Sequence, residues 1–222
     1  MKEEEGELDM NATQSEEKAI QSHGGLSDEA YEEIDQLTIE PLQDDGLISD
    51  DDLFDAARAL VECASAFSQT VCSCESFTAG LFCATIGSVP GASRVLRGGL
   101  VTYQTPLKTL LADVSPALIE EFGVVSAPCA AVMAYHTRQK LQADYCVSFT
   151  GNAGPDAMEG KPAGLIYCGL SGPRKTVVFK AHLQRERNGM RKLAVRSMLI
   201  TLRQMMEDDL LDAAAQKQDE QA

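Results

Sequence analysis

The stretch of this sequence best suited to nucleophilic chemistry is a serine followed by small residues. Ser76 comes after a β-like run, 70–74, and before Ala79, Gly80 and an apolar, helix-like run, 81–86. A hydroxyl at the end of a strand is accessible, and small residues allow a ligand or another backbone to approach closely. A helix N-terminus adds unpaired N–H groups and partial positive charge, which suit a developing anion. Because Ser and Thr are also ordinary helix caps, these residues alone leave the cap and the nucleophile as open alternatives.

The elements that must position Ser76 follow from the hydrophobic periodicity of the chain. Apolar runs of strand length alternate with runs of helical spacing, and Gly172-Pro173 separates a late pair of strands typical of an antiparallel hairpin. This pattern predicts an α/β fold, a layered α/β/α sandwich with a mixed, mostly parallel sheet. The predicted helices cover residues 50–67, 79–87, 108–111, 116–121, 127–141 and 188–209, and the predicted strands cover residues 70–74, 95–103, 144–150, 163–170 and 176–182.

Charge divides the chain into unequal parts. Residues 1–55 contain 19 acidic residues and 2 lysines, whereas the rest contains 15 acidic residues and 17 lysines and arginines. We therefore predict an acidic, disordered leader over residues 1–49, a near-neutral domain over residues 50–210 and a frayed polar tail over residues 211–222. A solvated leader and a leader that recruits an unknown partner both remain open.

Composition also excludes several classes of function. No basic stripe indicates nucleic-acid binding, and no apolar run is long enough to cross a bilayer. The acidic N-terminus has no signal-peptide character, and the count of seven cysteines is odd, which together predict free thiols in a reducing cytoplasm. Cys72 and Cys74 have no second pair and no histidine nearby, so we expect buried small side chains, no metal site and no cofactor.

Six short blocks, in order and at characteristic spacing, give the chain a specific resemblance. From about Leu53 to Met206 it resembles the C-terminal domain of the competence/damage-inducible CinA proteins, a family of nicotinamide mononucleotide amidohydrolases. The resemblance implies hydrolysis of the carboxamide of nicotinamide mononucleotide to nicotinate mononucleotide and ammonia, in pyridine-nucleotide recycling, by a protein that is often a dimer. The blocks are Glu75-Ser76-Phe77-Thr78-Ala79-Gly80, Ser88-Val89-Pro90-Gly91-Ala92-Ser93, Gly98-Gly99-Leu100-Val101-Thr102-Tyr103 with Lys108 five residues later, Gly123-Val124-Val125-Ser126, Thr150-Gly151-Asn152-Ala153-Gly154-Pro155 and Lys161-Pro162-Ala163-Gly164.

The resemblance also implies a role for individual residues. Ser76 is the expected nucleophile, Lys108 its base, and Tyr103 an assistant that relays the proton. Without the resemblance, Tyr103 is typical of an aromatic at the rim of a core and Lys108 of a solvated charge. Such a base must be partly neutral, which desolvation or a neighbouring cation would provide. Backbone N–H groups near Thr78–Gly80, at the helix start, would hold the oxyanion. The expected substrate-binding residues are Thr78, Ala79, Gly80, Thr150, Gly151, Ala153, Gly154, Lys161 and Arg187. Among them, the residues of the Gly151–Gly154 loop, Lys161 and Arg187 are the candidates for binding the nucleotide phosphate.

Two segments depart from the family pattern. Arg185-Glu186 stands where Gly-Asp is usual, and residues 156–160 replace the usual Gly pair, which puts the substrate preference in doubt. An amidase for a different small amide therefore stays open. So does a non-catalytic interaction protein linked to competence or the DNA-damage response.

Overall fold

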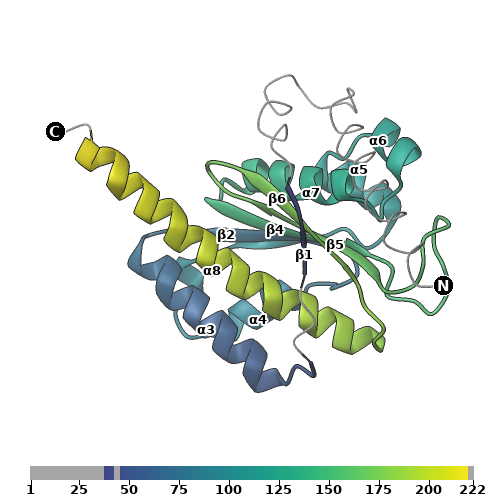
Figure 1. Cartoon of the computed structure of the whole chain (residues 1–222), viewed down its shortest axis with the longest axis horizontal. Helices are drawn as coiled ribbons and strands as arrows, with labels where there is room; N and C mark the ends of the chain where they lie inside the picture. Colours follow the sequence, from purple (N-terminus) through teal and green to yellow (C-terminus); the bar gives the residue numbers. More distant parts are fainter. Residues whose placement is uncertain (1–37, 43–45, 220–222) are drawn as a thin grey trace, which may run out of the picture.

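The computed structural model describes residues 38–42 and 46–219 of the 222-residue chain. In this part of the chain strands and helices alternate, as the sequence predicts (Figure 1). Their bounds are β1 Thr38–Pro41, α3 Asp50–Ala66, β2 Val71–Glu75, α4 Leu81–Gly87, the 3-10 turn η1 Ala92–Arg94, β3 Leu96–Val101, α5 Thr105–Ala112, α6 Pro116–Phe122, α7 Ala127–Leu141, β4 Tyr145–Gly151, β5 Leu165–Ser171, β6 Thr176–His182 and α8 Arg187–Asp219.

The described strands form one six-stranded sheet in the order β1-β6-β5-β4-β2-β3. Parallel pairing joins β1 to β6, β4 to β2 and β2 to β3, while β5 pairs antiparallel with both β4 and β6. β5 is thus the one described strand that opposes the others, which confirms a mixed, mostly parallel sheet. The carboxyl ends of β2, β3 and β4 consequently meet at one edge of the sheet, where ligands of open α/β sheets usually bind.

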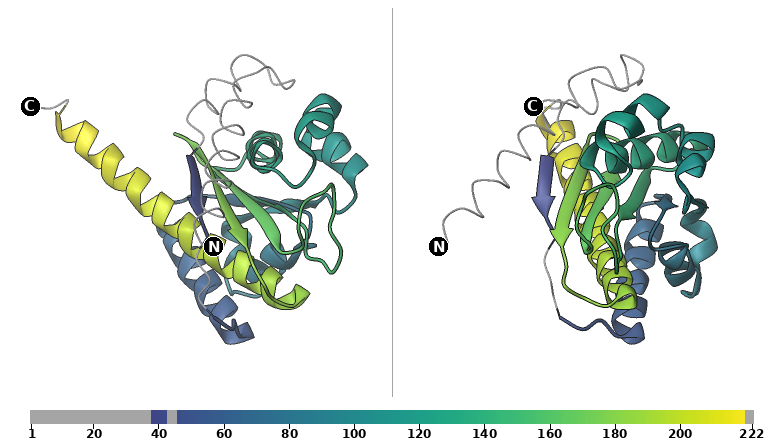
Figure 2. Two further views of the ribbon diagram at one scale, coloured as in Figure 1. Left: turned by 45° about the vertical axis from the view of Figure 1, so that its right-hand side comes forward. Right: turned by 90° about the vertical axis from the view of Figure 1, so that its right-hand side faces the viewer.

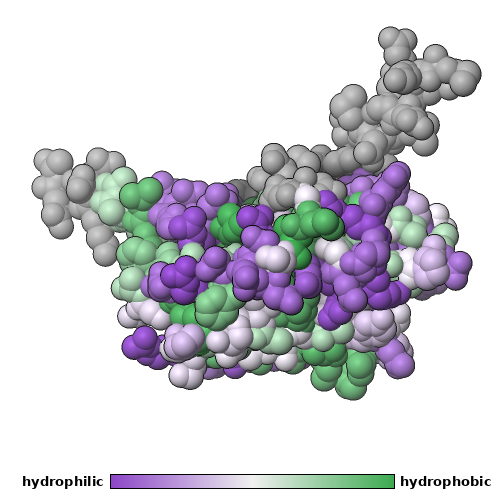
Figure 3. Space-filling model, turned by 90° about the horizontal axis from the view of Figure 1, so that it is seen from below, coloured by the Kyte–Doolittle hydropathy of each residue, from purple (hydrophilic) through white to green (hydrophobic). Residues whose placement is uncertain are grey.

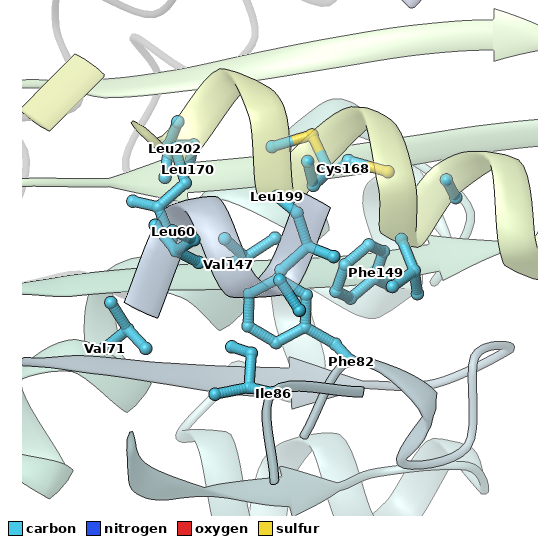
Figure 4. Packing of buried hydrophobic residues seen from close by; sticks show 14 of the residues in the cluster. Leu60, Val71, Phe82, Ile86, Val147, Phe149, Cys168, Leu170, Leu199 and Leu202 are labelled. Atoms are coloured by element: carbon cyan, nitrogen blue, oxygen red, sulfur yellow. The ribbon is translucent and has the colours of Figure 1, made fainter. Parts of the chain in front are cut away.

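Helices cover both faces of the sheet, which confirms the layered α/β/α arrangement (Figure 2). On one face, α3, α4 and α8 enclose a core in which Leu60, Phe82 and Leu199 pack against Val147 and Phe149 of β4 (Figure 4). On the other face α7 packs across the sheet, and α6 packs against α7. Seen from below, polar residues are interspersed with smaller hydrophobic areas on the molecular surface (Figure 3). The two cores fix the sheet between rigid layers, so side chains at its carboxyl edge are held by well-packed elements.

Side-chain caps fix the starts of α3 and α7. Ser49 and Asp52 form a capping box at the start of α3, in which the Ser49 hydroxyl accepts from the Asp52 N–H at 3.1 Å. Ser126 accepts from the Cys129 N–H at 3.3 Å and begins α7, as the sequence predicts. Each cap satisfies an N–H group that the helix itself leaves unpaired.

The structure differs from the predicted leader at residues 38–42. These residues form the edge strand β1, which pairs with β6 from Thr38↔Val177 to Pro41↔Lys180, and Leu42 N–H donates to the Lys180 carbonyl at 2.8 Å. Threonine and isoleucine favour strands, but four such residues are too few to stand out beside a highly acidic segment. The predicted disorder of residues 1–37 lies outside the described residues.

The last helix is longer at its C-terminal end than predicted. α8 spans 33 residues, starts one residue before Asn188 and runs ten residues past the predicted end at 209, so the tail over 211–219 is helical rather than frayed. The added residues contain neither Gly nor Pro and are mostly strong helix formers, which explains the extension. The C-terminal part of α8 projects beyond the sheet (Figure 1). Despite this length, no described helix has the apolar stretch that crossing a bilayer requires.

Candidate active site

Ser76 lies on a tight turn between β2 and α4. Its N–H donates to the Phe149 carbonyl at 2.9 Å, which fixes the residue against the end of β4. The turn then passes through left-handed conformations at Ala79, with φ of 50°, and Gly80, with φ of 89°. Such a conformation costs a residue with a Cβ about 1–2 kcal/mol, so the surrounding packing must hold Ala79 in place. The turn leaves the Ser76 side chain at the wall of a pocket.

Glu75, the residue before Ser76, occupies the N-terminus of α4. Its buried carboxylate accepts from the N–H groups of Phe82 and Cys83, both at 3.1 Å, and from the Ser73 hydroxyl at 2.9 Å. An internal carboxylate therefore engages the N–H groups of Phe82 and Cys83, while an oxyanion site at the N–H groups near Thr78–Gly80 stays a prediction.

Lys108 reaches Ser76 from the helix that follows β3. Three residues separate the end of β3 from the start of α5, and this short connection brings the Lys108 side chain back to Ser76. Its Nζ lies 3.0 Å from the Ser76 Oγ and 2.9 Å from the Thr102 carbonyl oxygen. Only 1% of Lys108 is exposed. The structure therefore brings together two side chains that lie 32 positions apart in the sequence.

Burial changes the acidity of this lysine. Desolvation lowers the pKa of Lys108 below its ordinary value of 10.5, and the nearby Cys129, Cys74 and Glu159 oppose this only in part. Desolvation also raises the pKa of Cys74 to about 11 and that of Cys129 to about 12, so both neighbouring thiols stay protonated at neutral pH. The amine therefore has the enhanced neutral fraction that a general base needs.

The cysteines fit the structural interpretation made from the sequence. Cys72 and Cys74 are fully buried on β2, where they act as small apolar side chains. Within residues 38–42 and 46–219, His, Cys, Asp and Glu form no group that could hold a metal ion. His136 and His182 do not line the pocket that contains Ser76, and His23 lies outside the described residues.

Tyr103 stands at the mouth of the pocket rather than between Ser76 and Lys108. It is 54% exposed, and its hydroxyl lies 3.5 Å from an amino group of Arg187. No hydrogen bond joins the Tyr103 hydroxyl to Ser76 or Lys108 in the described part of the chain. Ser76 and Lys108 contact each other directly, and the relay role of Tyr103 stays a prediction.

The loop after β4 is held by its own polar groups. The Thr150 hydroxyl donates to the Val124 carbonyl at 2.5 Å, and the Asn152 side chain accepts from Gly154 N–H at 2.9 Å and donates to the Asp156 carbonyl at 2.8 Å. The Thr150 hydroxyl and the Gly154 N–H are therefore occupied. The loop forms a firm wall and offers a substrate fewer free donors than its glycines suggest.

Two cations near the pocket differ in what they contact. Arg187 lines the pocket mouth, where its guanidinium donates to the Gly154 carbonyl at 2.5 Å and approaches Tyr103. Lys161 does not line the pocket, because its Nζ donates to the carbonyls of Phe122, at 2.5 Å, and Val125, at 2.7 Å. A third cation, Arg191, holds the turn after Ser76 by donating to the Thr78 carbonyl at 2.7 Å.

The pocket has a volume of about 140 Å³. It contains seven of the predicted site residues, namely Ser76, Lys108, Tyr103, Thr150, Gly151, Ala153 and Arg187. Five others, Thr78, Ala79, Gly80, Gly154 and Lys161, do not line it, and Thr78 is fully buried. Sequence reasoning missed Phe77, Thr105, Val124, Asn152 and Met158, four of which lie within or next to the recognised blocks.

Comparison with known proteins places this fold and site in a family. A family model described as the CinA C-terminal domain matches residues 54–206. A competence-damage inducible protein of Listeria monocytogenes is 44% identical over 139 residues, which cover 62% of this chain and 34% of that relative. A relative of the same description from Levilactobacillus brevis is 45% identical over 139 residues, which cover 62% of this chain and 33% of the relative. The chain thus spans about a third of the length of these relatives.

Solved structures agree with the sequence match. A competence/damage inducible protein from Agrobacterium tumefaciens has a TM-score of 0.65 and 27% identity, covering 68% of this chain and 93% of its own. A competence-damaged protein (CinA) superfamily protein from Escherichia coli has a TM-score of 0.67 and 24% identity, covering 72% of this chain and 94% of its own, and shows the shared fold alone. The chain therefore belongs to the CinA C-terminal domain family.

Proposed function

We propose that this protein hydrolyses the carboxamide of nicotinamide mononucleotide to nicotinate mononucleotide and ammonia. The observation that carries the proposal is the 3.0 Å contact between the Ser76 hydroxyl and the buried Lys108 amine. An amide carbon is a poor electrophile, so an activated hydroxyl that divides hydrolysis into acylation and deacylation lowers the barrier. The lowered pKa of Lys108 supplies the activating base.

In acylation, neutral Lys108 takes the proton from the Ser76 hydroxyl as its oxygen attacks the carboxamide carbon. The tetrahedral oxyanion is stabilised by backbone N–H groups of the turn that follows Ser76. Lys108, now an ammonium, returns its proton to the departing nitrogen, so the C–N bond breaks and ammonia leaves. An ester between the substrate acyl group and Ser76 remains.

In deacylation, Lys108 acts on water. The amine takes a proton from a water molecule that attacks the ester carbon, and it then returns the proton to the Ser76 oxygen as the C–O bond breaks. The carboxylic acid product ionises, and the enzyme returns to its starting state. The same amine thus serves as base and acid in both halves of the reaction.

The pocket walls support a substrate with a flat ring and an anionic tail. Phe77, Val124 and Met158 supply apolar surface near Ser76, which suits a pyridinium ring. Arg187 lies exposed at the mouth and is the candidate for the nucleotide phosphate. Lys161 is not a candidate, because two backbone carbonyls already engage its ammonium.

An ammonia-release screen of purified protein tests the proposal. Nicotinamide mononucleotide, free nicotinamide and unrelated small carboxamides are compared at equal concentration. We expect release from nicotinamide mononucleotide well above the others, because only that molecule places both a ring and a phosphate. Absence of release from it, with the protein folded, rejects the proposal.

One observation favours an amidase for a different small amide. Met158 enters the pocket wall from the segment 156–160, which departs from the family pattern. A changed wall near the nucleophile alters which ring fits. The same screen decides between the two, because a preference for another carboxamide would keep the Ser76 and Lys108 chemistry and change the substrate.

The alternative of a non-catalytic interaction protein rests on the acidic N-terminal segment and on the names of the relatives, which refer to competence and damage. A deletion that separates the readings must end before Thr38, because β1 belongs to the sheet. Unchanged ammonia release after deletion of residues 1–37 favours the enzyme. Loss of a captured partner, in a protein that never releases ammonia, favours the alternative.

A further inference from the structure

The segment that departs from the family pattern forms a tight hairpin. Met158 and Lys161 exchange backbone hydrogen bonds at 2.9 and 3.1 Å, and the two residues between them, Glu159 and Gly160, have φ of 55° and 70°. Positive φ at both central residues is the signature of a type I′ turn, which normally carries Asn-Gly or Gly-Gly. Glutamate is an unusual occupant of the first central position, so its side chain must contribute something that offsets the strain.

The Glu159 side chain reaches across to the segment between α6 and α7. Its two carboxylate oxygens accept from the N–H groups of Val124, at 3.1 Å, and Val125, at 3.2 Å. Charge-assisted hydrogen bonds of this kind are stronger than bonds between neutral groups. One side chain thus ties the hairpin to the segment that provides Val124 to the pocket.

Lys161 completes the connection from the other end of the hairpin. Its Nζ donates to the carbonyls of Phe122 and Val125 and lies 4.0 Å from the Glu159 carboxylate. The Glu159 carboxylate therefore accepts from N–H groups of the 122–125 segment, and the Lys161 ammonium donates to carbonyls of the same segment. We call these contacts of Glu159 and Lys161 the loop lock.

Gly123 shows how closely the two segments approach. A Cβ at this position would lie 2.3 Å from a carboxylate oxygen of Glu159, and φ is 75°. Glycine therefore leaves the space that the Glu159 carboxylate fills. The pocket walls formed by Met158 and Val124 are fixed relative to each other by the carboxylate between them.

We propose that Glu159 is a positioning residue that holds Met158 and Val124 as the walls of the ring-binding part of the pocket, and so determines which flat carboxamide is accepted. The substrate named in this inference rests on the proposed function, whereas the contacts of Glu159 do not depend on it. Glu159 contacts neither Ser76 nor the pocket, so its hydrogen bonds act on the substrate through the two walls, and its charge separately opposes the lowering of the Lys108 pKa. Its loss should weaken ring binding more than it slows the chemical step.

The test substitution is Glu159→Gln, which removes the negative charge of the side chain and keeps its shape. Asp156→Asn is the matched control, because it removes a charge from the same loop at an exposed position. Because the Glu159 charge also raises the pKa of Lys108, kinetics are compared on the high-pH plateau, where the amine is neutral in both proteins. There we expect Glu159→Gln to raise KM for nicotinamide mononucleotide about tenfold and to change kcat less than about twofold, the pattern of lost binding rather than lost chemistry. Asp156→Asn should change neither constant by more than about twofold.

A double-mutant cycle with Met158→Ala shows whether Glu159 acts through Met158. If it does, adding Glu159→Gln to Met158→Ala raises KM by much less than it does in the wild-type background. Full additivity of the two changes, or a Glu159→Gln effect confined to thermal stability, overturns the proposal.

Amide hydrogen exchange keeps the inference separate from the proposed function. Glu159→Gln should speed exchange at Val124 and Val125 about tenfold or more, whereas Asp156→Asn leaves it unchanged. If the wild-type protein releases no ammonia, the proposed function fails and this exchange comparison still decides the loop lock. Unchanged exchange in Glu159→Gln overturns the lock whatever the substrate.

Discussion

Two lysines, Lys108 in the pocket wall and Lys161 outside it, show how the same type of side chain serves two purposes. Lys108 is buried, contacts a hydroxyl and one carbonyl, and forms no ion pair among the described residues. Lys161 is partly exposed, contacts two carbonyls and lies 4.0 Å from a carboxylate. Burial lowers the pKa of Lys108 and so favours an amine that can accept a proton, whereas the contacts of Lys161 connect two backbone segments. The comparison separates a reactive lysine from a structural one.

The largest expected effect is the loss of the reactive lysine. Lys108→Met keeps the length of the side chain and removes the proton acceptor, so ammonia release should fall about 10³-fold. Lys175→Met is the matched control, because Lys175 is exposed at the far end of the β5–β6 hairpin. Circular dichroism and the melting temperature show whether the variant stays folded. Retention of more than about a tenth of the wild-type rate would exclude Lys108 as the base.

The pH dependence of the wild-type rate sharpens the same point. Because burial lowers the pKa of Lys108 below 10.5, the rate should rise as the amine loses its proton and level off before pH 10.5. The unfolded chain binds this proton more tightly, so the contribution of Lys108 to stability also rises with pH and is complete above 10.5. A plot of kcat/KM against pH measures the apparent pKa. A value of kcat/KM that stays constant between pH 7 and pH 10 would contradict a lysine base.

Removal of the structural lysine should have a smaller and different effect. Lys161→Met breaks the loop lock, so we expect KM to rise about tenfold with little change in kcat. The shape of the pH–rate profile should stay that of the wild type, since Lys161 takes no proton. Steady-state kinetics at several pH values separate the two lysines. A shifted profile would mean that Lys161 takes part in proton transfer.

The smallest expected effect is that of Tyr103→Phe. The Tyr103 hydroxyl lies 3.5 Å from Arg187 and makes no hydrogen bond to Ser76 or Lys108 within the described residues, so kcat should fall by less than about fivefold. Tyr135→Phe, on α7 away from the pocket, is the matched control. A fall of a hundredfold or more would restore the proton-relay role that the family resemblance implies.

The sequence predicts the fold well, and the family resemblance predicts the contact between Ser76 and Lys108. Strand and helix periods are strong over the core elements, and five of the six recognised blocks contribute residues to, or lie beside, one sheet edge. The proximity of Ser76 to Lys108 could not be read from spacing. It depends on the direction of α5, which brings Lys108 to Ser76. We expected this contact only because of the family resemblance.

Other features depend on long-range contacts that local patterns do not carry. The four residues of β1 form a strand because they pair with the backbone of β6 at the edge of the sheet. Their strand pattern is difficult to recognise in the sequence because the N-terminal segment around them is highly acidic. Lys161 contacts Phe122, 39 positions away, so its direction could not be predicted. The same holds for Glu75, whose carboxylate fills the start of α4.

The most direct test of the central claim is ammonia release from nicotinamide mononucleotide by wild-type protein and by Ser76→Ala, measured side by side. Ser76→Ala removes the proposed nucleophile and leaves Lys108, the pocket walls and Arg187 in place. We predict release by the wild type and none above background by the variant, with both proteins folded. Equal release by the two proteins would contradict a serine nucleophile activated by Lys108.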